Sequence, residues 1–215
     1  MGRDQERSVS MSGLKEEDVP YPPLHPLIVY EALAKQVIED YGVKEGFCLD
    51  IGSGVGMLGI ELARRTRLDV VLVDIRKDVL LGGLRNAEYF GVRHRVSAVQ
   101  ADVHSLPFRP DAAELIVSRG SIPFWRDRVK AFREIHRVLA GSGVAFIGGG
   151  LSRNLPEEVR VELRERIRRW FSSPEGRKYD PPERWKAEEW LRKAGIMRFR
   201  IILEDPGRWI EFRKR

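Results

Sequence analysis

The chain has few of the residues that support redox or metal chemistry. Its 215 residues include one cysteine, Cys48, and four histidines. A single thiol cannot form an intrachain disulfide, and the histidines lack the Cys-x-x-Cys or His-x-x-x-His spacing of metal ligands. Because Cys48 falls within the first predicted strand, we expect a buried core thiol rather than a nucleophile. The sequence therefore predicts no metal site.

Long apolar runs are also missing. No stretch approaches the ~20 apolar residues of a membrane-spanning helix. The first 13 residues, MGRDQERSVSMSG, contain no apolar segment of the kind found in secretory signals. We therefore expect a cytoplasmic protein without a membrane partner. Hydrophobic residues make up 42% of the chain, which is enough for a full core, and the length fits one domain or one domain with an appendage.

The most informative pattern lies in residues 49–63, LDIGSGVGMLGIELA. An apolar run ends at Asp50, three glycines follow at alternate positions, and helical spacing of apolar residues then begins. A second apolar run, VVLVDI, ends at Asp74. The order strand, glycine turn, helix and strand is that of the nucleoside-binding half of a doubly wound sheet. Glycine permits positive φ and close approach of a ligand, and Asp74 is placed to accept hydrogen bonds from a ribose diol.

The glycine turn alone leaves the nucleoside open. Gly54, Gly56 and Gly59 also fit the dinucleotide pattern G-x-G-x-x-G. A carboxylate at Asp50 would not favour a nearby pyrophosphate, whereas it would suit a ligand with a cationic amino group. The chain also offers no second nucleotide-binding half. An NAD-dependent oxidoreductase is therefore the weakest alternative. The plain structural alternative is a tight turn that binds nothing.

Five segments in order resemble the class I S-adenosylmethionine-dependent methyltransferases. They are LDIGSGVG, VVLVDI, QADVHSLPF (100–108), AAELIVSRGSIPFW (112–125) and AFREIHRVLAGSGVAFIGG (131–149). The resemblance runs from about residue 25 to the end. It implies S-adenosylmethionine as the cofactor. It also implies Asp50 near the methionine end, Asp74 on the ribose, Asp102 on the adenine amino group and Val103 against the adenine ring.

The cofactor site implied by this resemblance comprises Asp50, Gly52, Ser53, Gly54, Gly56, Asp74, Ile75, Asp102, Val103 and Ser118. One segment departs from part of the family. Members that methylate amide or adenine nitrogens carry an Asn/Asp-Pro-Pro-aromatic motif where this chain has Ser118-Arg119-Gly120-Ser121. Methylation of such nitrogens is therefore disfavoured.

The expected fold is α/β, a doubly wound, mostly parallel seven-stranded sheet with helices on both faces and a C-terminal antiparallel strand pair. Periodicity predicts helices at 27–41, 56–65, 126–139, 155–171 and 183–194, with another that ends at Gly91. It predicts strands at 47–51, 69–74, 95–100, 113–118 and 144–148, then RFRIILED and RWIEFRKR around a Pro-Gly turn. Another turn is expected at Gly141-Ser142-Gly143.

The chain is expected to divide into two parts. Residues 1–24 form a flexible N-terminal segment that could close as a lid, and residues 25–215 form a single methyltransferase domain. Within that domain, residues 151–182 are a helical insertion near the substrate site. The apolar stripe of Val159, Leu163, Ile167 and Trp170 on this insertion is expected to contact the core.

The acceptor site is less defined than the cofactor site. Candidate acceptor residues are Tyr21, His25, Tyr30, Arg119 and Trp125. Arg119 directly follows a strand and could bind an acceptor carboxylate or phosphate, or equally form a structural salt bridge. No catalytic residue is assigned, because a methyl group on a sulfonium already has a good leaving group and a protein base is not obligatory.

The distribution of charge bears on whether the acceptor is a small molecule or RNA. The net charge is +6, with 38 Lys and Arg against 32 Asp and Glu. Residues 151–215 hold 18 basic and 12 acidic residues, so the remainder of the chain balances at 20 and 20. The basic third could serve an RNA methyltransferase, or it could be a solvated surface of local ion pairs. A small-molecule acceptor is the main prediction, RNA (tRNA or rRNA) the alternative, and a non-catalytic nucleoside-binding subunit is less favoured.

Overall fold

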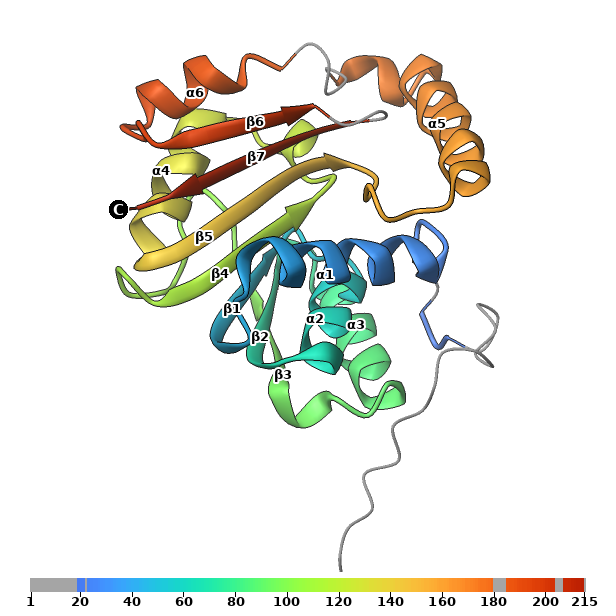
Figure 1. Ribbon diagram of the computed structural model, residues 1–215, viewed down its shortest axis with the longest axis horizontal. Coiled ribbons are helices and arrows are strands. Elements are labelled where there is room, and N and C mark those ends of the chain that lie inside the picture. The colour runs from blue at the N-terminus through green and yellow to red at the C-terminus, as the bar shows by residue number, and fades with distance from the viewer. Residues whose placement is uncertain (1–18, 22, 180–184, 204–206, 215) are drawn as a thin grey trace, which may run out of the picture.

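One twisted sheet organises the whole molecule (Figure 1). The computed structural model describes residues 19–21, 23–179, 185–203 and 207–214. Its seven strands lie in the order β3-β2-β1-β4-β5-β7-β6. They are β1 (Glu45–Ile51), β2 (Arg67–Asp74), β3 (Val96–Gln100), β4 (Ala113–Arg119), β5 (Leu139–Gly150), β6 (Phe199–Leu203) and β7 (Gly207–Arg213). β1 to β5 are parallel, and β7 runs antiparallel between β5 and β6. The predicted fold class is confirmed.

Helices cover both faces of the sheet. The helices are α1 (Leu27–Tyr41), α2 (Met57–Arg65), α3 (Lys77–Tyr89), α4 (Arg128–Val138), α5 (Glu157–Ser172) and α6 (Ala187–Lys193). The first three pack on one face, and α4 and α6 pack on the other. α5 stands apart, beyond the end of β5 (Figure 1).

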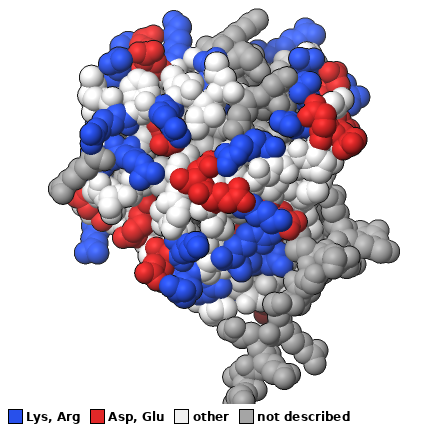
Figure 2. Space-filling view, in the orientation of Figure 1, with Lys and Arg blue, Asp and Glu red and all other residues white. Residues whose placement is uncertain are grey.

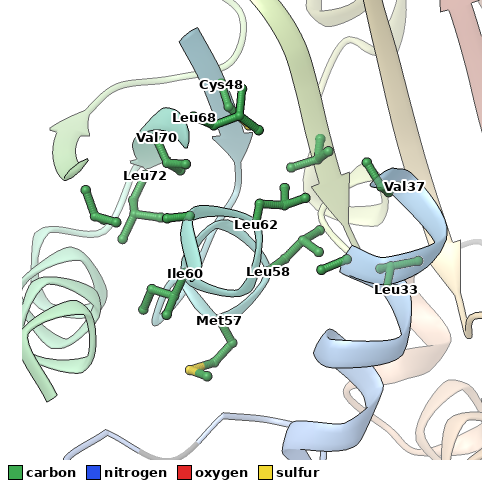
Figure 3. Packing of buried hydrophobic residues seen from close by; sticks show 14 of the residues in the cluster. Leu33, Val37, Cys48, Met57, Leu58, Ile60, Leu62, Leu68, Val70 and Leu72 are labelled. Carbon is green, nitrogen blue, oxygen red and sulfur yellow. The ribbon is translucent and has the colours of Figure 1, made fainter. Parts of the chain in front are cut away.

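Two apolar cores follow from the alternation of side chains along each strand. On β1, Cys48 belongs to the core beneath α1, α2 and α3, whereas Leu49 belongs to the core beneath α4 and α6. Cys48 is fully buried, and burial raises the pKa of its thiol, in keeping with the expected core role. Figure 3 shows apolar side chains of α2 that point toward Leu72 on the sheet and toward Leu33 on α1. The packing of α2 on the sheet and on α1 therefore fixes the position of the glycine turn that precedes it.

The predicted turn at Gly141-Ser142-Gly143 is wrong. α4 ends at Val138 and β5 begins at the next residue. The pairing of β5 with β4 passes from Ala113 opposite Leu139 to Leu115 opposite Val144, so three extra residues form a bulge inside one strand. A Cβ atom at Gly143 would lie 2.8 Å from the carbonyl oxygen of Ala113. The local glycine signal thus reflects close approach of two strands rather than a reversal of the chain.

Some expectations concern residues outside the described ranges. Residues 1–18, which the sequence predicts to be flexible, lie outside them, as do residues 180–184 and the Pro206 half of the predicted Pro-Gly turn. The described end of the N-terminal segment packs on the domain, because Val19 is buried in the core and the Tyr21 amide donates to Asn86 Oδ1 on α3 at 3.0 Å.

The apolar stripe of α5 also differs from expectation. Of its four residues only Leu163 is fully buried, where it packs with Val29 of α1 and Leu151. Ile167 and Trp170 instead line a pocket described below, and Trp170 is 39% exposed. None of the described helices combines the length and apolar character needed to cross a bilayer.

Candidate active site

The glycine turn is fixed by hydrogen bonds to β2. Val73 O accepts from the amides of Gly52 and Ser53 at 2.7 and 3.1 Å. The Asp74 carboxylate accepts from the Gly54 amide at 2.9 Å and from the Arg76 amide at 3.0 Å. Asp74 therefore holds the turn and lies where the carboxyl ends of β1 and β2 meet, the edge at which open α/β sheets bind ligands.

Two glycines of this turn serve different purposes. Gly54 and Gly56 have φ of 55° and 80°, which strongly favours glycine at both positions. A Cβ atom at Gly54 would meet nothing within 4 Å, so the space above it is open to a ligand. A Cβ atom at Gly56 would lie 2.5 Å from Leu72 Cδ1, so this glycine allows the turn to pack on the sheet.

Asp50 is a buried carboxylate beneath the turn. It is 2% exposed, and its Oδ2 accepts from the Gly59 amide at 2.9 Å. Burial raises the pKa of Asp50 to about 7, opposed by the Gly59 hydrogen bond and reinforced by the negative charge of Asp74. An ammonium group next to Asp50 would favour the ionised carboxylate and lower that pKa. The environment is thus suited to a cationic ligand group.

Asp102 follows β3 and is already engaged by protein groups. Its Oδ1 accepts from the backbone amide and the Nδ1 of His104, and its Oδ2 accepts from Arg126 Nη2 at 3.0 Å. The Asp127 amide donates to His104 Nε2 at 3.1 Å, so we assign the ring proton to Nδ1. These interactions, the His104 amide first, lower the pKa of Asp102. His104 and Arg126 were missed from the sequence, although His104 stands within QADVHSLPF.

The remaining predicted cofactor residues lie around the same edge. Ser118 is fully buried at the end of β4, and its hydroxyl lies 2.6 Å from that of Ser121. A Cβ atom at Gly52 would lie 2.4 Å from Ser121 Cβ, so the loop after β4 rests on the glycine turn. Val103 is buried, and Ile75 is 63% exposed beside Asp74. The structure thus brings the ends of β1, β2 and β4 together.

A pocket of about 180 Å³ opens beyond the ends of β4 and β5. Its walls come from the N-terminal segment, the loop after β4, the end of β5, α5 and the start of the α6 region. The lining residues are Leu24, His25, Arg119, Gly120, Pro123, Phe124, Gly149, Gly150, Arg166, Ile167, Trp170, Phe171 and Trp185. Two of the five predicted acceptor residues, His25 and Arg119, are among them.

Arg119 and Tyr30 connect the pocket to the glycine turn. Arg119 Nε donates to Gly150 O at 3.2 Å, and its Cζ lies 5.4 Å from the centroid of the Tyr30 ring. Tyr30 lies near enough to Asp50 for that carboxylate to raise its pKa, although burial is the larger cause. Burial lowers the pKa of Arg119. No carboxylate within the described residues pairs with Arg119, so the salt-bridge alternative has no support there.

His25 is a neutral imidazole on the wall of the pocket. Burial, followed by the positive charges of Arg119 and Arg166, lowers the pKa of His25 to about 3. Its Nδ1 is buried and has no hydrogen-bond partner among the residues that the structure describes.

Two predicted acceptor residues lie elsewhere. Tyr21 packs on α3, where Arg85 donates to its hydroxyl at 3.1 Å. Trp125 is buried in the core against Phe132, with ring centroids 5.5 Å apart, whereas its neighbour Phe124 faces the pocket. Sequence reasoning also missed Arg166 and Phe171. The sequence predicts the 151–182 insertion near the substrate site but assigns the apolar stripe of its helix to the core, whereas Ile167 and Trp170 line the pocket. Across the described part of the chain, no three His, Cys, Asp or Glu side chains gather as a metal site requires.

Comparison with known proteins gives consistent relatives. Residues 49–147 match a family described as a methyltransferase domain. A solved structure from Methanococcus maripaludis, assigned as an S-adenosyl-L-methionine-dependent methyltransferase, is similar with a TM-score of 0.77 and 35% identity, covering 87% of this chain and 85% of that one. The malonyl-[acyl-carrier protein] O-methyltransferase of Geobacter sulfurreducens is 30% identical over 166 residues, 69% of this chain and 61% of that protein.

A ubiquinone/menaquinone biosynthesis C-methyltransferase of Marinomonas sp. is 30% identical over 118 residues, 54% of this chain and 47% of that protein. The chain thus spans about half to three fifths of the length of these two curated relatives. The family match begins in β1, one residue before Asp50, and ends in β5 at Ile147. It therefore contains the glycine turn and the carboxyl ends of β1 to β4, and it stops three residues before the end of β5. The match, the seven-stranded sheet and the similarity along most of the Methanococcus protein together show that the chain belongs to the class I S-adenosylmethionine-dependent methyltransferases.

Proposed function

We propose that the protein transfers the methyl group of S-adenosylmethionine to a small-molecule acceptor. The observation that carries this proposal is the continuity of the two sites. The glycine turn with Asp50 and Asp74 is joined through Tyr30 and Arg119 to a pocket of about 180 Å³. That volume is below the ~300–1,000 Å³ of pockets that enclose drug-sized ligands. A small acceptor would lie directly beside the predicted methionine end of the cofactor.

The residues fit S-adenosylmethionine at its distinct chemical groups. Asp50 would face the methionine ammonium, the open space at Gly54 would admit the ligand, and Asp74 would bind the ribose hydroxyls. Ile75, Asp102 and Val103 would hold the adenine, and Gly52, Ser53, Gly56 and Ser118 would shape the floor. When bound, the cofactor supplies a methyl group on a sulfonium. The chain itself needs only to align the acceptor and exclude water.

The pocket determines the proposed acceptor class more than the relatives do. The two curated relatives are named for malonyl-[acyl-carrier protein] and for ubiquinone/menaquinone biosynthesis, which differ widely in chemistry. The helical insertion at 151–182 supports a specific acceptor, because α5 contributes Ile167, Trp170 and Phe171 to the pocket wall. We propose that this insertion selects the substrate. The cytoplasmic location stays a prediction.

RNA is the disfavoured acceptor. Figure 2 shows basic and acidic side chains interspersed across the visible face rather than one basic field. On α5, Arg160 pairs with Glu157 at 3.1 Å and Arg168 pairs with Glu165 at 3.2 Å. Carboxylates at this density repel phosphates and already neutralise neighbouring arginines.

Binding of S-adenosylhomocysteine to Asp74→Ala tests the cofactor assignment. We expect micromolar affinity for the wild type and at least ~10-fold weaker binding for the variant, because it loses charged hydrogen bonds of roughly 1.5–3 kcal/mol. Asp78→Ala is the matched control, since Asp78 is exposed nearby and pairs with the Arg76 side chain. Calorimetry with NAD in parallel tests the oxidoreductase alternative. Wild-type affinity in Asp74→Ala would remove the ribose assignment.

A further inference from the structure

The pocket beyond β4 and β5 has one strongly apolar wall. Phe124 is 56% exposed, and its ring lies 6.4 Å from that of Trp170 and 4.8 Å from that of Tyr179. The rings of Trp170 and Tyr179 stack at 5.9 Å with an interplanar angle of 9°. Exposed aromatic rings in a concave site favour a flat apolar ligand that covers them.

The pocket also carries positive charge. Arg119 and Arg166 both line it, and none of the described residues that line it is an Asp or a Glu. Arg166 Nη2 donates to Leu24 O at 2.9 Å, which places its guanidinium at the N-terminal wall. Both cations act on His25, which is uncharged and offers an unpartnered Nδ1 within the described structure. A half-buried cation with no carboxylate partner among the described residues costs free energy that a bound anion would offset.

We propose that the acceptor is a small apolar acid, with an aromatic or aliphatic body on the Phe124–Trp170 wall and one carboxylate on Arg119. This inference rests on the proposed function, whose acceptor class it narrows. Arg119 is the binding residue for the carboxylate, and Arg166 adds charge at the rim. The planar guanidinium matches a carboxylate by a pair of parallel hydrogen bonds.

A carboxylate fits this site better than a phosphate ester. Arg119 is half-buried in the pocket, whereas Arg166 is exposed. Arg119 alone balances the single negative charge of a carboxylate, whereas a dianionic phosphate would also need the exposed Arg166 at the rim as a partner.

Three matched probes test the inference with the full-length protein saturated with S-adenosylhomocysteine. They are phenylacetate, phenylacetamide and phenyl phosphate, with affinities measured by ligand-observed NMR and calorimetry. We expect phenylacetate to bind at least ~10-fold more tightly than phenylacetamide. Arg119→Gln should abolish this preference, and Arg166→Gln should reduce it several-fold. Phe124→Ala should weaken both phenylacetate and phenylacetamide.

Arg168→Gln is the matched control, because Arg168 lies on the same helix as Arg166, outside the pocket, and pairs with Glu165. If Arg119→Gln does not fold, Arg166→Gln and Phe124→Ala still decide the question. Equal binding of acid and amide, an undiminished preference in the foldable variants, tighter binding of phenyl phosphate, or no probe binding while S-adenosylhomocysteine binds would each overturn the inference. Failure of S-adenosylhomocysteine itself to bind would instead overturn the proposed function.

Discussion

At the scale of single residues, burial shifts the pKa values of Asp50 and His25 in opposite directions. Asp50 is a carboxyl group whose pKa rises from 3.8 to about 7, and His25 is an imidazole whose pKa falls from 6.5 to about 3. Burial is the largest cause for both, because a low-polarity environment disfavours whichever form is charged. Each residue therefore lowers the stability of the free protein at a pH where its charged form would prevail in the unfolded chain.

The contributions of these two residues to the free energy of unfolding depend on pH in opposite senses, so they can be measured separately. The folded protein holds the Asp50 proton between pH about 4 and 7 while the unfolded chain releases it, so stability falls as pH rises through this window. The unfolded chain protonates His25 between pH 6.5 and about 3 while the folded protein does not, so stability falls as pH falls through that window. We expect Asp50→Asn to remove the first slope and His25→Gln the second.

Urea unfolding of both variants and the wild type at a series of pH values measures these slopes. Each is on the order of a few kcal/mol across its window. Asp69→Asn is the control, because Asp69 is exposed on β2. A wild-type slope in Asp50→Asn would mean that Asp50 is not the buried acid that titrates. Bound S-adenosylhomocysteine should flatten the first slope, since its ammonium group favours ionised Asp50.

At the scale of the element, the glycine turn separates folding from binding. Gly54→Val places its side chain in open space, so the cost is the strained positive φ, about 1–2 kcal/mol. Gly56→Val adds a clash with Leu72, so its cost is larger. We therefore expect Gly54→Val to remain folded and lose cofactor binding, and Gly56→Val to lose several degrees of melting temperature. Circular dichroism melts with calorimetry distinguish the two. Undiminished binding by folded Gly54→Val would show that the ligand does not approach this residue.

The elements also show what sequence patterns can predict. α1 was predicted at its observed bounds, because the helical period and the left-handed Gly42 at its end are local signals. The start of β5 was missed, because pairing with β4 overrides the Gly-Ser-Gly turn signal. The stripe on α5 was recognised, but not the pocket it faces, because periodicity says which side chains share a face and not what lies opposite.

The candidate site shows the same division. The ends of β1, β2 and β4 meet as predicted, because the order of strands in a doubly wound sheet determines which ends are neighbours. Trp125 and Phe124 could not be told apart from the sequence, since adjacent aromatic residues in a short 3₁₀ turn point in different directions. The cation of Arg119 was identified, but its lack of a described carboxylate partner depends on residues distant in the chain.

At the scale of the whole molecule, the chain has a net charge of +6. On the face shown in Figure 2, basic and acidic side chains are interspersed rather than gathered in one basic field. On α6, Arg192 pairs with Glu188 at 3.0 Å and Lys193 with Glu189 at 2.6 Å, which repeats the arrangement on α5. Exposed pairs of this kind contribute only ~0.3–0.5 kcal/mol each. We expect their main effect to be weaker binding of polyanions by the basic third, because each carboxylate offsets the charge of a neighbouring cation.

Weak RNA binding follows from this distribution. We expect a single-stranded RNA oligomer to bind weakly and without sequence preference, and to dissociate near physiological salt. Few phosphate contacts give a shallow salt dependence, about −0.7 per contact on a log–log plot. Reversing exposed charges in Arg168→Glu and Arg192→Glu should change that slope little. Fluorescence anisotropy across a salt series measures it. A tight complex at physiological salt, or labelled methyl transfer to one tRNA or rRNA nucleotide, would support RNA as the acceptor.

A single carboxamide joins parts of the molecule that lie far apart in the chain. Asn86 Nδ2 donates to the carbonyl oxygens of Tyr21 and Val55, at 3.0 and 3.1 Å, while its Oδ1 accepts from the Tyr21 amide. Val55 belongs to the glycine turn, and Tyr21 belongs to the N-terminal segment. The two binding equilibria are then coupled. If a ligand on the glycine turn makes the packing of Tyr21 on α3 more favourable by some factor, the packing of Tyr21 raises the affinity for that ligand by the same factor.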